Sequence, residues 1–274
     1  MRLSISNIAW DSNLDVEILN ILKELHISSI DIAPSKYFPN YIDIKTNKFA
    51  EINHWWLDRG VKIEGMQSLL FGTKGLNMFG DSGTQQKMLH HLSQICKIAN
   101  ALNCRKLVFG SPRNRDRSEI KDDNLAFNIA IKFFKELGDI ASDHGVIFCL
   151  ESNPECYGSN FMTSHQETAL IVKYVSSSSI KMQLDLGALS IAKEDVEKCS
   201  TIYKNIIGHI HISEPNLDPI GTHQINHSIY GDVLKKYLPD TTATVEMLAM
   251  HKSKPIKTIK KSLQTAKLYY ESFL

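Results

Sequence analysis

Short runs of apolar and β-branched residues recur at regular intervals along the chain. Each run is mostly uncharged and is bounded by polar or turn-forming residues, and eight can be counted, at residues 2–6, 28–33, 61–70, 106–111, 146–152, 180–186, 207–213 and 242–248. Nearly continuous apolar character is typical of strands that are covered on both faces of a sheet. The pattern therefore predicts eight buried strands.

Between these runs the apolar positions follow the spacing of amphipathic helices. In residues 14–25, four leucine and isoleucine side chains fall on one face of a helix. Similar spacing recurs at residues 85–102, 124–145, 164–175 and 256–273. Ser164, with Glu167 three residues later, predicts a capping box at the start of one of these helices.

The regular alternation of strand and helix decides the predicted fold class. Eight such units without adjacent strands favour an α/β fold in which a parallel sheet closes into a (β/α)8 TIM barrel with outer helices. An open doubly wound sheet is the alternative. Because no Pro-, Gly- or Ser-rich linker of useful length interrupts the chain, we expect a single barrel domain over residues 1–274.

Composition limits the classes of molecule that the protein is expected to bind. Lys and Arg number 31 against 30 Asp and Glu, so the formal charge of +1 provides no global field to attract nucleic acid or an anionic membrane. The sequence has neither a signal-peptide pattern nor a long uncharged apolar stretch, and its five cysteines show no C-x-x-C spacing. We therefore expect a cytosolic protein with a small-molecule partner. A homo-oligomer is compatible with this composition.

Four of the predicted strands end in residues with the chemistry of metal ligands. Working residues of (β/α)8 barrels lie at the C-terminal ends of the strands, and the fifth to eighth segments place Glu151, Asp185, His211 and Glu246 there. Each alone has an ordinary explanation: an ion pair for a glutamate, a helix cap for Asp185, or core packing for His211. Three converging carboxylates would repel one another, however, so the four together favour a mononuclear metal site.

The predicted ligand set suggests both the metal and the reaction. Three carboxylates and one imidazole suit Mn²⁺ first, with Mg²⁺, Co²⁺ or Zn²⁺ able to substitute. Such an ion would polarise a substrate carbonyl and stabilise an enediolate. Glu151 and Glu246, from strands that are not neighbours, would remove and return a proton. The residues alone leave open whether the proton returns to the same carbon, which is epimerisation, or to its neighbour, which is isomerisation.

Further polar residues lie at or just after the predicted strands, where hydroxyl-binding groups would be needed. These substrate-binding candidates are Asn7, Gln67, Ser111, Arg113, Asn153, Tyr157, Asn160 and Glu214. Local hydrogen bonding within the loop is the alternative for each. Arg113, Arg115 and Arg117 would suit a phosphate group, although a solvated face is the commoner explanation. His209 shares a strand face with His211, so we expect it to support that ligand or to pack beside it.

Several motifs give the chain a family resemblance. Residues 150–164 (LESNPECYGSNFMTS), 184–188 (LDLGA), 209–215 (HIHISEP) and 244–247 (TVEM) resemble the xylose-isomerase-like TIM barrels. That family includes D-tagatose and D-psicose 3-epimerases, xylose isomerase, inosose dehydratase and, more distantly, endonuclease IV. The resemblance extends over nearly the whole chain through strand order. It implies a sugar or sugar-phosphate isomerase or epimerase, with one divalent ion bound by Glu151, Asp185, His211 and Glu246.

Departures from the family pattern leave the substrate open. Position 188 is Ala188, where the family often has a histidine, and no arginine closely follows His211. An endonuclease IV-like nuclease would need further histidines, which these strand ends lack. A dehydratase of a cyclic polyol or sugar on the same site, and a non-catalytic sugar-binding barrel, are the remaining alternatives.

Overall fold

Eight parallel strands form a closed barrel in chain order. The computed structural model describes residues 1–223 and 225–271. In these residues each strand pairs with the next and the last pairs with the first. The strands are β1 (Arg2–Ser6), β2 (Ser29–Ile32), β3 (Lys62–Met66), β4 (Lys106–Phe109), β5 (Ile147–Leu150), β6 (Ile180–Asp185), β7 (Ile207–Ser213) and β8 (Thr242–Glu246). The predicted (β/α)8 barrel is confirmed, and the open doubly wound sheet is excluded.

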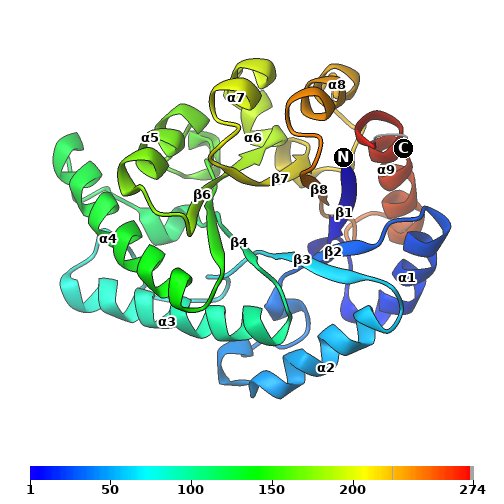
Figure 1. Cartoon of the computed structure of the whole chain (residues 1–274), viewed down its shortest axis with the longest axis horizontal. Helices are drawn as coiled ribbons and strands as arrows, with labels where there is room; N and C mark the ends of the chain where they lie inside the picture. Colours follow the sequence, from blue (N-terminus) through cyan, green and yellow to red (C-terminus); the bar gives the residue numbers. More distant parts are fainter. Residues whose placement is uncertain (224, 272–274) are drawn as a thin grey trace.

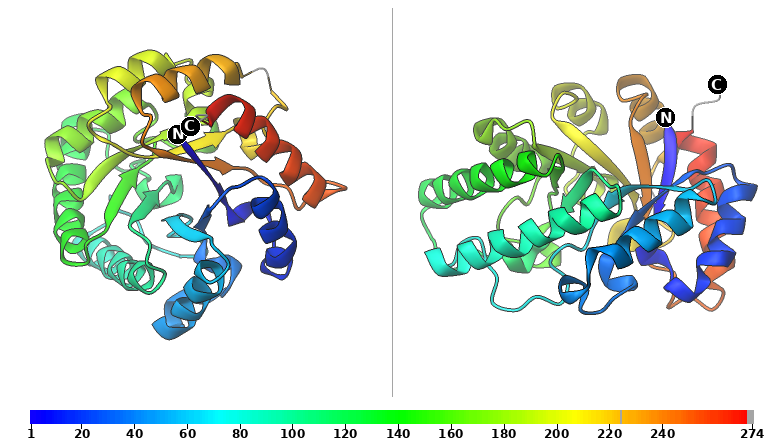
Figure 2. Two further views of the ribbon diagram at one scale, coloured as in Figure 1. Left: turned by 45° about the vertical axis from the view of Figure 1, so that its right-hand side comes forward. Right: turned by 60° about the horizontal axis from the view of Figure 1, so that its bottom comes forward.

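Helices surround the strands as an outer ring (Figures 1 and 2). They are α1 (Asp15–Glu24), α2 (Thr46–Leu57), α3 (Ser82–Ala101), α4 (Asp123–Asp143), α5 (His165–Val175), α6 (Leu186–Ile191), α7 (Val196–Ile202), α8 (His227–Tyr237) and α9 (Pro255–Tyr270). The predicted helical spans correspond to α1, α3, α4, α5 and α9, and the end of the last predicted span lies outside the described residues. None of the described helices is long and apolar enough to cross a membrane.

The predicted capping box at α5 is present in a modified form. The Ser164 hydroxyl accepts a hydrogen bond from the Glu167 N–H at 3.1 Å. The Glu167 carboxylate reaches back to the N–H of Thr163 at 2.8 Å, one residue before the position that the motif predicts. Both bonds satisfy N–H groups that would otherwise lack partners at the helix start.

The core fills the space between strands and helices. All residues of β2 and β8 are buried, as expected for strands covered on both faces. Aromatic side chains join the two layers: Phe109 of β4 meets Phe134 of α4 edge to face, with ring centroids 5.4 Å apart. This packing holds the strand ends in place around the barrel mouth.

One irregularity in the sheet makes room for a buried acid. The pairing of β2 with β3 shifts register between Ile30 and Asp31, and Asp31 then pairs with Gly65. A Cβ atom at Gly65 would lie 2.6 Å from the Asp31 carboxylate, so a glycine is required there. The shift and the glycine together allow Asp31 to lie inside the barrel.

Candidate functional site

The four predicted ligands meet at one point inside the barrel mouth. A ligand atom from each of Glu151, Asp185, His211 and Glu246 lies within 4.8 Å of the others. Nδ1 of His211 is 3.2 Å from the Glu246 carboxylate, 3.3 Å from that of Glu151 and 3.8 Å from that of Asp185. All four residues are buried. The structure thus brings the predicted set together, and its binding of a metal remains a prediction.

Strand register and one glycine explain this convergence. Asp185, the last residue of β6, pairs with His211, which lies two residues before the end of β7 rather than at the predicted strand end. Glu246, the last residue of β8, pairs with Ser213 at the end of β7, so the register brings these three residues to the same edge of the barrel. Gly110 follows β4 beside Glu151, and a Cβ atom there would overlap the Glu151 carboxylate. Gly110 is a site residue that the sequence analysis missed, although a glycine directly after a strand is a visible signal.

Asp185 is held from two sides. One oxygen accepts the N–H of Ala188 at 2.6 Å and caps α6, which was the ordinary explanation for this residue. The other oxygen accepts a hydrogen bond from the Ser213 hydroxyl at 2.8 Å, and the same oxygen lies toward His211. The cap therefore leaves one edge of the carboxylate directed at the cluster.

The charges of the cluster depend on one another. Burial and the nearby Glu151 and Glu246 raise the pKa of Asp185 to about 7. Burial opposes the charged form of His211, but Glu246 and Glu151 raise its pKa well above the usual value. Burial also acts to raise the pKa of Glu246, but His211 and a 2.5 Å hydrogen bond from Gln67 lower it overall. The metal-free site thus retains protons where acids converge.

The cluster has the properties of a divalent-cation site. Within the described residues, Oε1 of Glu151 and both ring nitrogens of His211 are buried without a hydrogen bond that meets the usual geometry. Buried polar atoms normally have partners, and a cation would satisfy these. The donor set of three carboxylates and one imidazole fits such an ion.

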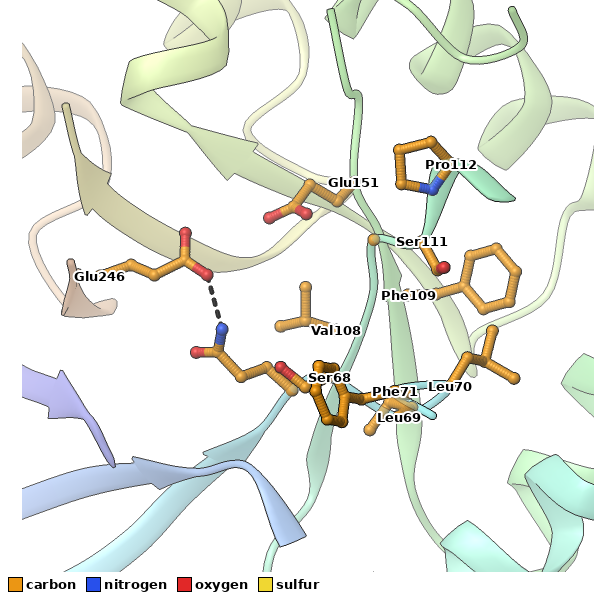
Figure 3. A pocket seen from close by; sticks show the side chains of 12 residues that line it. Ser68, Leu69, Leu70, Phe71, Val108, Phe109, Ser111, Pro112, Glu151 and Glu246 are labelled. Atoms are coloured by element: carbon orange, nitrogen blue, oxygen red, sulfur yellow. Dashed lines mark hydrogen bonds between the residues drawn. The ribbon is translucent and has the colours of Figure 1, made fainter. Parts of the chain in front are cut away.

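Two cavities adjoin the cluster and share Gly110, Glu151 and Glu246. The first, which we call the β3–β4 cavity, measures about 240 Å³ and is otherwise lined by Gln67, Ser68, Leu69, Leu70, Phe71, Val108, Phe109, Ser111 and Pro112. The second, the β5–β7 cavity, measures about 190 Å³ and is otherwise lined by Asn153, Tyr157, Asp185, Gly187, Ala188, Ser213, Glu214 and Leu217. Figure 3 shows the Glu151 and Glu246 carboxylates directed toward each other in the first cavity.

Five of the predicted substrate-binding residues line these cavities. Gln67 and Ser111 belong to the β3–β4 cavity, and Asn153, Tyr157 and Glu214 to the β5–β7 cavity. Gln67 donates to Glu246, while its Oε1 is buried without a hydrogen-bond partner among the described residues. Gln67 therefore offers a free acceptor beside a candidate catalytic carboxylate.

Glu214 is engaged by its own surroundings. Its carboxylate accepts the N–H groups of Gly221 at 2.8 Å and His223 at 3.2 Å, and it lies 2.8 Å from Nε2 of His227. These contacts tie the loop after β7 to α8. Local hydrogen bonding, the alternative for this residue, is therefore present.

Three other candidates lie outside the sets that line the two cavities. The side-chain oxygen of Asn7 accepts the N–H of Ala33 at 2.7 Å. The Asn160 amide donates to Asp116 at 2.6 Å, and Arg113 is exposed. Their predicted contact with substrate receives no support from this geometry.

The arginines after β4 do not gather around a phosphate position. Arg115 is fully buried and donates to the backbone oxygen of Glu151 at 2.7 Å and to the side-chain oxygen of Asn153 at 2.6 Å. Arg117 pairs with Asp123. Arg115 thus braces the loop that carries Glu151, a role that the sequence did not indicate.

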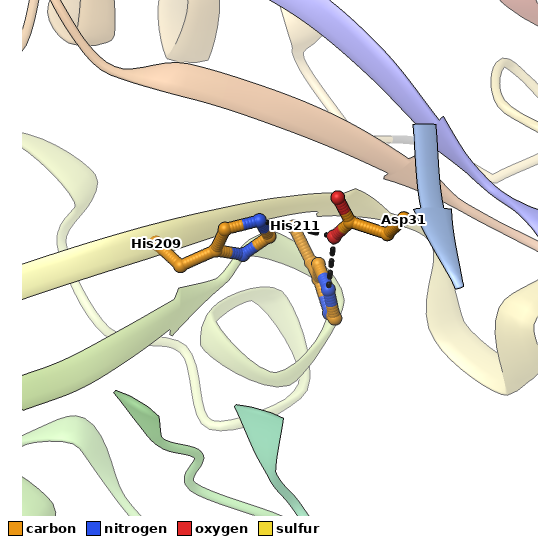
Figure 4. A group of neighbouring side chains, drawn as sticks. All are labelled: Asp31, His209 and His211. Carbon is orange, nitrogen blue, oxygen red and sulfur yellow. Dashed lines mark ion pairs between the residues drawn. The ribbon is translucent and has the colours of Figure 1, made fainter. Parts of the chain in front are cut away.

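His209 lies beneath the cluster with Asp31 (Figure 4). Nδ1 of His209 is 3.1 Å from the Gln183 side-chain oxygen, and Nε2 is 3.0 Å from the Asp31 carboxylate. The same Asp31 oxygen lies 3.9 Å from Nε2 of His211. Asp31 is thus a site residue that strand-end patterning did not predict, although a lone acid inside an apolar strand is a signal.

Solved structures share this fold over nearly their full length. A D-psicose 3-epimerase with D-tagatose, from Clostridium cellulolyticum H10, superposes with a TM-score of 0.82 at 16% identity and covers 99% of this chain and 100% of that chain. The 3-keto-D-glucoside 4-epimerase YcjR from E. coli gives 0.79 at 12% identity, covering 98% and 99%. The IOLI protein with a binding zinc atom gives 0.75 at 18% identity, covering 99% and 100%.

The family follows from a separate comparison. No curated protein matches the chain. Because the solved structures share so little sequence identity with this chain, they establish its fold and nothing more. The family model described as xylose isomerase-like TIM barrel, however, matches residues 19–268, which include all four predicted ligands. The chain therefore belongs to the xylose isomerase-like TIM barrel family.

Proposed function

We propose that the protein is a divalent-metal-dependent sugar isomerase or epimerase that transfers a proton by means of Glu151 and Glu246. The observation that carries this proposal is that both carboxylates border both cavities while each lies within 3.3 Å of the same His211 nitrogen. A substrate bound at the cluster would therefore have an acid on either side. Membership of the family and the sugar epimerases of the same fold support this chemistry.

The donor set assigns the residues that would hold the metal. Glu151, Asp185, His211 and Glu246 would bind one divalent ion, for which Mn²⁺ is our first choice. When bound, the ion supplies Lewis-acid polarisation of a carbonyl and stabilises the negative charge that develops beside it. The zinc of the IOLI protein belongs to that protein and does not decide the metal here.

The two glutamates differ in their surroundings. Glu246 is kept ionised by His211 and by the hydrogen bond from Gln67, which suits it to accept a proton from carbon. Glu151 receives a weaker hydrogen bond of 3.3 Å from the Asn153 amide and lies on the other side of the shared space. In the reverse direction the two carboxylates exchange roles.

Isotope exchange tests the proposal. Protein loaded with Mn²⁺ is incubated in D₂O with a panel of ketoses and aldoses, and NMR follows deuterium at the carbon next to the carbonyl. We expect exchange with at least one sugar, and its loss in Glu151→Gln and Glu246→Gln. Glu51→Gln, an exposed position on α2 paired with Lys48, is the matched control and should retain exchange.

The same samples separate the alternatives. Loss of water from the substrate, seen by mass spectrometry, would indicate a dehydratase. Sugar binding that survives in Glu246→Gln, together with no exchange in the unaltered protein, would indicate a non-catalytic binding barrel. Either result would overturn the proposed isomerase or epimerase activity.

A further inference from the structure

The β3–β4 cavity has an extended apolar wall. Six of its lining residues are hydrophobic, namely Leu69, Leu70, Phe71, Val108, Phe109 and Pro112, although the Phe109 ring packs outward against α4. Phe71 lies at the outer side of the cavity, with 69% of its surface exposed. Among the polar groups, the Ser111 hydroxyl already donates to Asn114 at 2.6 Å. Figure 3 shows this wall beginning directly beside Glu151 and Glu246.

The charge around both cavities opposes an anionic substrate. Among the described residues, the lining of the two cavities contains no Lys or Arg. Four carboxylates line the β5–β7 cavity, those of Glu151, Asp185, Glu214 and Glu246. A phosphate ester carries about −1.5 to −2 charges at neutral pH and requires basic side chains or free N–H groups. One divalent ion would not offset both the acids and a phosphate.

Backbone donors near the second cavity are also engaged. The N–H of Gly187 donates to the Ser213 hydroxyl at 2.9 Å, and the N–H of Ala188 donates to Asp185. The nearest buried arginine, Arg115, donates to the loop after β5. Both terminal nitrogens of Arg115 are thus engaged; its Nε has no partner within the described residues, but Arg115 does not line either cavity.

We propose that the substrate is an unphosphorylated sugar with a terminal methyl group in place of a hydroxymethyl group, as in a 6-deoxyketose. The methyl end lies against the wall formed by Leu69, Leu70 and Phe71, while the reacting carbons lie between Glu151 and Glu246. A hydroxymethyl group would lose hydrogen bonds to water on this wall, whereas a methyl group is favoured there. This inference rests on the proposed function for the position of the reacting carbons.

Three matched ligands test the inference: a ketohexose, its 6-deoxy analogue and its 6-phosphate. Calorimetry with the Mn²⁺-loaded protein measures binding, and exchange in D₂O measures turnover. We expect the 6-deoxy sugar to bind about tenfold more tightly than the parent sugar. The phosphate ester should bind on the order of 100-fold more weakly. Phe71→Ala should remove most of the 6-deoxy preference, whereas Leu125→Ala, an exposed control on α4, should keep it.

The two readouts distinguish failure of the inference from failure of the reaction. The expected binding order without exchange would retain the inference and overturn the isomerase proposal. Exchange with tightest binding of the phosphate ester, or of the parent sugar, would overturn the inference alone. Absence of binding by all three ligands would overturn both.

Asp31 carries a second, independent inference. Its side chain is fully buried, and neither oxygen makes a hydrogen bond of usual geometry within residues 1–223 and 225–271. It lies beneath His211, whose Nδ1 faces the carboxylate cluster and whose Nε2 faces Asp31 (Figure 4). An imidazole binds a metal only through an unprotonated nitrogen, so coordination by Nδ1 places the ring proton on Nε2.

We infer that Asp31 is a positioning residue whose carboxylate, 3.9 Å from Nε2 of His211, favours the ring proton on that nitrogen and thereby keeps Nδ1 free for the metal. Metal-bound histidines commonly donate their other ring N–H to a carboxylate, and loss of that partner costs about 10–100-fold in metal affinity. Gly65 and the register shift between β2 and β3 make room for the Asp31 carboxylate inside the barrel. His209, 3.0 Å from Asp31, holds it in place from the other side.

Metal binding and stability together test this role. Asp31→Asn should weaken Mn²⁺ binding by about 10–100-fold in calorimetry. The thermal midpoint of the metal-free protein should fall, because the substitution breaks the buried pair of Asp31 with His209. Asp15→Asn is the control: Asp15 is a partly buried acid that accepts hydrogen bonds from Trp10 and Tyr37, so its substitution should also lower stability but leave metal affinity unchanged.

If Asp31→Asn fails to fold, a measurement on the unaltered protein tests the same inference. Long-range ¹⁵N NMR of the protein loaded with diamagnetic Mg²⁺ or Zn²⁺ should show His211 protonated on Nε2 and protected from exchange with water. Protonation on Nδ1, or metal affinity in Asp31→Asn equal to that of the unaltered protein, would overturn the inference.

Discussion

The two halves of the barrel contribute different things to the site. The four candidate ligands come from β5 to β8 or the residue directly after β5. The half formed by β1 to β4 contributes the apolar wall, the Gln67 donor, the space at Gly110 and the buried Asp31. One half thus carries the reactive groups, and the other determines where they lie and what can approach them.

This division explains why the reactive half is not sufficient by itself. The Glu151 carboxylate occupies space that exists only because residue 110 is a glycine, and Glu246 is held by Gln67. Catalytic groups displaced by about 1 Å lose much of their effect. Substitutions in the half formed by β1 to β4 should therefore lower the exchange rate, although this half supplies no candidate metal ligand.

The largest effect is expected in the ligating half. Glu246→Gln removes both a candidate proton acceptor and one of three converging charges. Loss of general base catalysis should lower the exchange rate by about 10²–10⁴-fold. Steady-state exchange measured at saturating Mn²⁺ separates this effect from weaker metal binding. A rate within twofold of the unaltered protein would remove Glu246 from the mechanism.

Gly110→Ala tests the dependence on the other half. The added Cβ atom would overlap Glu151, which must move. We expect a loss of about 10²-fold in exchange, as for a misplaced catalytic group, while circular dichroism shows an intact fold. Gly83→Ala is the matched control, since its Cβ atom would meet only Asp81 at an ordinary 3.5 Å. Equal exchange rates in Gly110→Ala and Gly83→Ala would show that the action of Glu151 does not depend on the space beside Gly110.

The pH dependence of metal binding tests the charge balance of the ligating half. The raised pKa of Asp185, about 7, means that the folded metal-free protein takes up a proton that the unfolded chain binds only near the ordinary value of 3.8. The stability from this proton is complete below that ordinary value and is lost as pH rises through about 7. Metal must displace the proton, so affinity should rise with pH.

Calorimetric titration with Mn²⁺ between about pH 6 and pH 8 checks this expectation. Affinity should rise by up to about tenfold per pH unit for each displaced proton, and buffers of different ionisation enthalpy should report proton release. The raised pKa of His211 acts in the same direction. Affinity that falls with rising pH would contradict the charge balance described for the cluster.

The smallest effect on activity is expected from a helix cap between β4 and β5, where the two halves join. Asp122 caps α4, between β4 and β5, by accepting the N–H groups of Asn124 at 2.8 Å and Leu125 at 3.1 Å. Asp122→Ala should lower the free energy of unfolding by about 1 kcal/mol in urea titration. Exchange activity should stay unchanged, because the cap contacts neither cavity. A large loss of activity would show that helix placement and chemistry are not separable here.

Local sequence determined the elements and the residues at their ends. Buried strands require apolar residues on both faces, and helices require a 3.6-residue apolar period, so both patterns were visible without a structure. The barrel class followed from their alternation. Glu151, Asp185 and Glu246 were visible because an acid at the end of an apolar run stands out from its neighbours, and His211 because an imidazole between two isoleucines does.

Tertiary structure decided the features that depend on contacts between distant segments. The register shift between β2 and β3, the carboxylates that fill the space beside Gly65 and Gly110, and the engagement of Arg115 by the loop after β5 cannot be read from a single segment. Each depends on which atoms another strand brings within a few ångströms. Short-range patterning fixes which residue faces the barrel, whereas its partners are fixed only when the sheet closes.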